Sequence, residues 1–153
     1  MNPLSWILAF RWPLEIIALI AAVLPMLIIL RAWDTLPEEI PMHFGITGRP
    51  DRWGGRWQAW ILPFVSLAVY VFLSVMSGTW GWLMGRVSPS MQGEALALPL
   101  WIKLMEGLVF SYIVSMTVRI ARHEAERLNG WVIGALIVLT GAPPGLMAIL
   151  KGH

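Results

Sequence analysis

Long stretches without charge constrain this chain more than any other feature. No charged residue occurs from Trp57 to Gly85 or from Leu128 to Leu150. Each stretch exceeds the ~20 apolar residues that a helix needs to cross the hydrocarbon core of a bilayer. Two further stretches, Trp12 to Leu30 and Pro99 to Val118, contain only one and two charged residues. With 58% hydrophobic and 13% charged residues overall, the composition excludes a soluble globular domain.

We therefore expect an all-α integral membrane protein, a four-transmembrane-helix bundle that forms a single membrane domain over residues 1–153. A long structured loop, residues 33–56, joins the first two helices. Small residues at four-residue spacing, such as Gly107 and Ser111 or Gly130 and Gly134, favour close helix packing and a homo-oligomer. The expected helices cover approximately residues 12–32, 57–82, 98–119 and 130–150.

Arginine is unevenly distributed between the two membrane sides. With an even number of helices, the first and third loops lie on the same side of the membrane. These two loops hold seven arginines, whereas the segments on the other side hold three or four cations. Because cytoplasmic loops are enriched in Lys and Arg, both loops are expected in the cytoplasm, in a multi-pass protein of the bacterial plasma membrane. The basic residues flank helices, so we expect a lipid bilayer and no nucleic acid as partner. The seven arginines of the first and third loops are Arg31, Arg49, Arg52, Arg56, Arg119, Arg122 and Arg127.

The first loop is polar and rich in turn residues. It carries eight of the twenty charges of the chain between Arg31 and Arg56. Pro37 and Pro41 favour an extended backbone, because proline fixes its own φ and restricts the preceding residue. Gly45 and Gly48 permit a chain reversal, and a type I turn fits residues 49–52. We expect a short hairpin against the membrane surface.

The same loop resembles a sequence signature of a bacterial membrane family of unknown function. The domain of that family forms the first module of SdpI-type proteins, which act in immunity and signalling toward a sporulation-delaying peptide toxin. The second SdpI module, with its Asn-Pro and Arg-Thr-Pro segments, is not found in this chain. The signature is carried by Leu36-Pro37, Ile40-Pro41, His43-Phe44, Gly48, Pro50-Asp51 and Trp53.

The resemblance implies a non-enzymatic role. It points to sensing of, or immunity toward, a membrane-active peptide, or to regulation of a partner membrane protein. The positions that it marks as ligand-binding or loop-structuring are Pro41, His43, Gly48, Pro50, Asp51 and Trp53.

His43 leaves three roles open: metal ligand, proton-sensitive switch, or hydrogen-bond anchor of the loop. Helix parity places His123 of the third loop on the same membrane side. A membrane-embedded metal-dependent enzyme that uses both histidines is therefore the alternative function, and zinc its metal, although we expect no cofactor. The chain has no cysteine, so thiolate ligands are excluded. The candidate metal ligands are His43, His123, Asp51, Glu124 and Glu126.

Lys103 and Glu106 lie one helical turn apart within the third expected helix. Charges inside a membrane cost about 2.5–3.5 kcal/mol on insertion scales, so they are usually paired and functional. We expect an intramembrane charge pair between these two residues. A small transporter or channel that uses this pair is a second alternative function.

Overall fold

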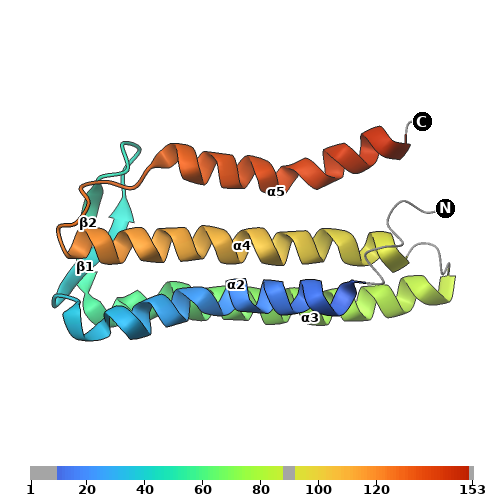
Figure 1. Ribbon diagram of the computed structural model, residues 1–153, viewed down its shortest axis with the longest axis horizontal. Coiled ribbons are helices and arrows are strands. Elements are labelled where there is room, and N and C mark those ends of the chain that lie inside the picture. The colour runs from blue at the N-terminus through green and yellow to red at the C-terminus, as the bar shows by residue number, and fades with distance from the viewer. Residues whose placement is uncertain (1–9, 88–91, 152–153) are drawn as a thin grey trace.

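The computed structural model describes residues 10–87 and 92–151, which form four long helices and one β-hairpin (Figure 1). The helices are α2 (Arg11–Ala32), α3 (Ile61–Val87), α4 (Gln92–Ala121) and α5 (Gly130–Lys151). Two strands, β1 (Glu39–Phe44) and β2 (Pro50–Gly55), follow α2, and short 3-10 helices at Trp33–Thr35 and Arg56–Trp60 flank the hairpin. The expected all-α fold is thus correct for the helices and is extended by a small two-stranded sheet.

The helix α4 is central to the bundle. It packs against α2 and α3 on one side and against α5 on the other, with the hairpin at one end of the bundle (Figure 1). Three segments of the described chain are long and apolar enough to cross a membrane: Arg11–Thr35, Arg56–Trp80 and Leu98–Ala121. In α5 the apolar stretch Gly130–Gly141 is shorter. The protein is therefore a largely helical membrane protein with three or four apolar helices.

Helix boundaries differ most from the expected ones where proline is involved. The α-helical part of α3 begins only at Ile61, since residues 56–60 form a 3-10 helix. The helix α4 begins at Gln92 and continues through Pro99, its eighth residue, where proline removes one intrahelical hydrogen bond but does not end the helix. Residues 143 and 144, both proline, lie within α5, which is bent along its length in Figure 1.

Small side chains bring α2 and α4 into close contact. Ala18, Ala21 and Ala22 are buried on α2. A Cβ atom at Gly107 of α4 would lie only 2.6 Å from the carbonyl carbon of Ala21. Gly107 therefore permits the backbone approach that membrane helices use for packing. On α5, by contrast, a Cβ atom at Gly134 meets no described atom within 4 Å, so that spacing is not used for packing within the described part of the chain.

The hairpin is attached to the bundle through an apolar cluster. Leu36 precedes the hairpin and Ile40 lies in β1, and both are buried against α2 and α4. Tryptophans cover the same end, where the ring of Trp33 lies 4.8 Å from that of Trp57 and the Arg56 guanidinium lies 4.9 Å from the Trp33 ring centroid. Indole rings prefer the headgroup level of a membrane, so this end of the bundle is the one expected at a membrane surface. The cluster comprises Ile29, Ala32, Leu36, Ile40, Ala59, Val114, Val118 and Ala121.

Candidate functional site

The hairpin turn is built on two glycines. The Gly45 amide donates to the Arg49 carbonyl at 2.9 Å, and the Gly48 amide donates to the Gly45 carbonyl at 2.8 Å. Gly48 has a φ of 77°, in the left-handed region that favours glycine. The expected reversal at these glycines is confirmed. The type I turn expected at residues 49–52 is wrong, because β2 begins at Pro50 and an edge position tolerates the missing donor of proline.

His43 and Asp51 face each other across the two strands. His43 Nδ1 lies 2.6 Å from Asp51 Oδ1, and the two side chains are 59% and 51% exposed. A bond to the carboxylate fixes the orientation of the imidazole ring. This leaves Nε2 of His43 directed away from Asp51 and free to meet a ligand.

The third loop is docked on the hairpin turn. The Leu128 amide donates to the Gly48 carbonyl at 2.8 Å. A Cβ atom at Gly48 would run into the Leu128 carbonyl group, so only glycine allows this approach. Arg122 adds a second link, because its guanidinium donates to Thr35 Oγ1 and, at 3.4 Å, to the Ala32 carbonyl at the end of α2. The two loops therefore form one platform, which consists of residues 36–55 and 122–129.

His123 ends α4. It has a φ of 59°, its amide donates to the Ile120 carbonyl at 3.0 Å, and the Glu124 amide donates to the Arg119 carbonyl at 2.8 Å. These two bonds are those of a Schellman motif, with His123 where glycine is the usual residue. Sequence reasoning missed this role, since the glycine that would signal it is absent. Its ring lies beside a hollow that Pro50, Trp53 and Glu126 also line.

The candidate metal ligands do not gather in one place. All five lie within the described residues, and among those residues no group of three or more His, Asp or Glu side chains is placed to hold a metal ion. The platform brings the two loops together as expected. It places His43 with Asp51 on the hairpin, however, and His123 with Glu126 at a separate hollow. The combined zinc site is therefore not formed by these residues.

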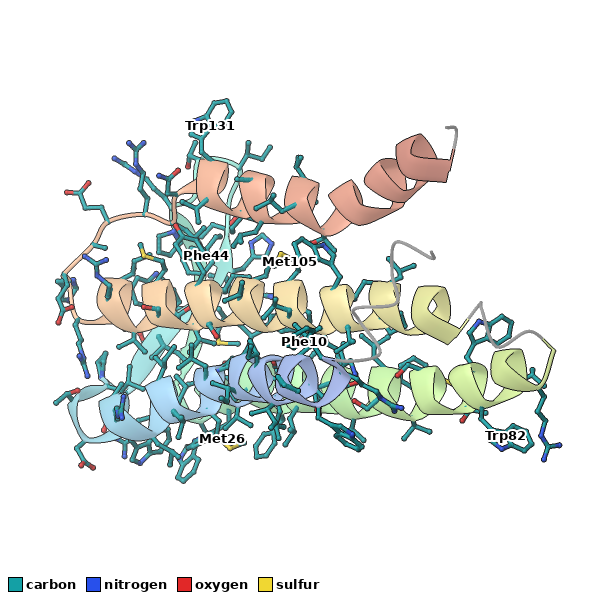
Figure 2. All side chains as sticks on the ribbon, turned by 45° about the vertical axis from the view of Figure 1, so that its right-hand side comes forward. Phe10, Met26, Phe44, Trp82, Met105 and Trp131 are labelled. Atoms are coloured by element: carbon teal, nitrogen blue, oxygen red, sulfur yellow. The ribbon has the colours of Figure 1, made fainter. Side chains whose placement is uncertain are left out.

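An apolar cavity of about 470 Å³ lies beneath the hairpin. Its walls come from β1, the start of α3, the second half of α4 and the start of α5. In Figure 2 Phe44 of β1 lies between α4 and α5, while Trp131 points away from the bundle. His43 is the titratable residue of the lining. The lining also includes Ile40, Met42, Ile113, Thr117 and Ile133.

The start of α5 is fixed next to this cavity. The Asn129 side chain accepts a hydrogen bond from the Trp131 amide at 3.1 Å and thereby caps the helix. The Asn129 amide donates to the Tyr112 hydroxyl of α4 at 3.0 Å. A second hollow, lined by Thr47, Arg127 and Asn129, adjoins the cavity at Leu128. The cavity thus adjoins polar groups of the first and third loops.

Inside the bundle Lys103 is paired with a different residue from the expected one. Lys103 Nζ lies 2.7 Å from Oε1 of Glu15 on α2, and Lys103 is fully buried. The expected pair of Lys103 with Glu106 is corrected accordingly: α2 packs closely on α4 and supplies a carboxylate at the level of Lys103. Tyr70 and Ser74 of α3 also contact this pair. Sequence reasoning missed the role of Glu15, because Glu15 and Lys103 lie on different helices and no helical spacing relates them.

Residues 20–67 match a protein family described as a domain of unknown function, DUF1648. This DUF1648 segment extends from the middle of α2 through the hairpin to the first residues of α3. An uncharacterized protein of Archaeoglobus fulgidus is 45% identical over 58 residues, which is 37% of this chain. The aligned stretch spans about a third, 32%, of the archaeal protein. No solved structure matches the chain.

The DUF1648 segment contains β1 and β2 and therefore His43, Gly48 and Asp51. It does not include the third loop, α4 or α5. The match therefore covers one side of the platform and only part of the cavity wall.

Proposed function

We propose that this membrane protein binds a membrane-active, amphipathic peptide and thereby senses or neutralises it. The observation that carries the proposal is the apolar cavity of about 470 Å³ beneath the hairpin, at the level of the tryptophans. A peptide that lies in the membrane interface buries one apolar face and keeps one polar face in water. The cavity and its rim are complementary to such a molecule.

The cavity, His43 and the contact between Gly48 and Leu128 would each contribute differently to peptide binding. Apolar side chains of the peptide enter the cavity between the hairpin and α5. The ring of His43, held by Asp51, donates or accepts a hydrogen bond at the rim. The hydrogen bond from the Leu128 amide to the Gly48 carbonyl keeps the site formed before binding, which reduces the conformational entropy lost on binding.

The resemblance to the first module of SdpI-type proteins supports a role in peptide immunity. The DUF1648 match covers the hairpin of this chain. No reaction is needed for this role, and we propose no metal and no cofactor. The zinc-dependent alternative lacks support because its ligands are divided between two places.

Binding can be tested with protein in liposomes and two labelled synthetic peptides. Each would have about 20 residues, with the same leucine pattern and either lysine or glutamate on the polar face. We expect saturable binding above the partition into empty liposomes, measured by fluorescence anisotropy. Ile133→Trp places a bulkier side chain in the lining of the cavity and should weaken saturable binding.

Ile137→Trp is the matched control. Ile137 lies one turn after Ile133 on α5 but is 61% exposed and is not part of the cavity lining. This variant should bind the peptide as the wild type does. If neither peptide binds saturably, or if Ile133→Trp leaves the affinity unchanged, peptide binding in this cavity is wrong.

A further inference from the structure

The bundle contains a buried charge pair with a complete set of partners. Both carboxylate oxygens of Glu15 accept hydrogen bonds from Lys103 Nζ at 2.7 Å. Lys103 also donates to Ser74 Oγ at 3.3 Å and lies 5.3 Å from the ring centroid of Tyr70. The Tyr70 hydroxyl donates to Glu15 Oε2 at 3.4 Å. One cation and one anion therefore neutralise each other among α2, α3 and α4.

Glu106 is a second carboxyl group in the same interior. Both of its oxygens are buried, and neither has a hydrogen-bond partner among the residues that the structure describes. The nearby hydroxyl of Ser66 on α3 donates its proton to the Ala22 carbonyl at 3.1 Å. It therefore does not donate a hydrogen bond to Glu106. An ionised carboxylate without donors in such a place costs several kcal/mol.

The surrounding helices offer Glu106 one cation within reach. Lys103 precedes it by three residues on α4, and residues three apart are neighbours on a helix surface. On α2 the guanidinium of Arg11 lies 5.4 Å from the ring centroid of Trp12, and Glu15 is an anion. On α3 the titratable groups are Tyr70 and Arg86, and Arg86 lies in the last turn of that helix, 4.0 Å from the ring centroid of Trp82. The helix α5 has no ionisable residue from Gly130 to Gly141.

We propose that Glu106 is a proton-binding site inside the membrane. It holds its proton while Lys103 is paired with Glu15, and it becomes the counter-ion of Lys103 when that pair is broken. In the exchange the O–H bond of Glu106 breaks, the proton passes to Glu15, and the Lys103 ammonium moves from Glu15 to Glu106. The cluster keeps one cation and one anion in both states, so no charge remains buried alone.

Infrared spectroscopy of the protein in liposomes tests this site, because protonated and ionised carboxyl groups give separate bands. At neutral pH we expect the wild type to show the band of one buried protonated carboxyl group. Glu106→Gln should remove it. Glu15→Gln should also remove it, although Glu106 is intact, because Glu106 then ionises to balance Lys103.

Glu124→Gln is the control, since this side chain is half exposed in the third loop, and the band should persist in it. Circular dichroism would confirm that each variant is folded. If Glu106→Gln does not fold, Glu106→Asp replaces it and should shift the band in frequency. The proposal is wrong if the wild type lacks the band, if Glu106→Asp leaves it unshifted, or if folded Glu15→Gln retains it. The site is independent of peptide binding, which none of these outcomes affects.

Discussion

Gly48 meets two separate requirements at one residue. Its backbone is left-handed, and a side chain would run into the Leu128 carbonyl group. A residue other than glycine pays about 1–2 kcal/mol for the left-handed conformation alone, and the contact with the third loop would be displaced as well. The platform thus depends on one residue that no other amino acid can replace without cost.

We predict that Gly48→Ala lowers the melting temperature in detergent, measured by circular dichroism, and increases tryptic cleavage after Arg127. Gly55→Ala is the control, because a Cβ atom there meets nothing within 4 Å and the backbone φ is −65°. Equal melting temperatures and equal cleavage for the two variants would contradict the docking of the third loop on the hairpin.

His123 occupies a left-handed position that glycine would occupy at lower cost. We predict that His123→Gly stabilises the protein by about 1 kcal/mol, the left-handed cost less the extra chain entropy of glycine. His123→Ala keeps the strained backbone and should change little. Thermal unfolding of the three proteins checks both statements. A loss of stability in His123→Gly would mean that the imidazole makes a stabilising contact of its own.

At the scale of elements, the contact between α2 and α4 depends on Gly107. A side chain there would meet the backbone of Ala21 at 2.6 to 2.8 Å, and packed membrane helices cannot separate without losing contacts. We predict that Gly107→Val lowers the melting temperature markedly. Gly134→Val, on the open side of α5, introduces the same residue into a helix and should leave it nearly unchanged. If Gly134→Val lowers the melting temperature more than Gly107→Val does, the contact of α5 with the bundle is tighter than the contact between α2 and α4.

The elements could largely be predicted from the sequence, because their causes are local. Uncharged stretches fix where helices lie, and Pro41, Gly45 and Gly48 indicate an extended segment with a reversal. The partner of Lys103 could not be predicted in this way. Glu106 is near Lys103 by helical spacing, whereas Glu15 is near it only because of the relative position of α2 and α4 along their axes. That position depends on the contact between Ala21 and Gly107. The small-residue spacing at Gly107 predicts a close helix contact but does not specify the partner helix.

The candidate site, too, could be predicted from the sequence only in part. The meeting of the first and third loops follows from helix parity and is observed. The separation of His43 from His123 depends on the place of His43 beside Asp51 in the hairpin and on the Schellman end of α4 at His123. The sequence carries no clear signal for either, since the glycine typical of a Schellman motif is absent. The cavity had no signal in the sequence, because its lining consists of ordinary apolar residues from elements far apart in the chain.

At the scale of the whole molecule, charge distribution predicts the orientation in the membrane. We expect the hairpin end, with its arginines, in the cytoplasm. The chain has no cysteine, so single cysteines report sidedness directly. Ile46→Cys at the exposed hairpin tip should react with a membrane-impermeant maleimide in inside-out vesicles only. Trp82→Cys, at the opposite end (Figure 2), should react in intact cells. The opposite labelling would place the platform outside the cell.

Peptide binding as proposed requires that the cavity beneath the hairpin receives the apolar face of a membrane-active peptide. Photo-crosslinking can detect this contact, with a benzophenone amino acid at Ile133 in the cavity or at Ile137 on the exposed face of α5. After illumination with the labelled leucine–lysine and leucine–glutamate peptides in liposomes, we predict saturable crosslinking from Ile133 and only weak, unsaturable crosslinking from Ile137. Equal crosslinking from both positions, or none from Ile133, would show that the peptide does not bind in this cavity.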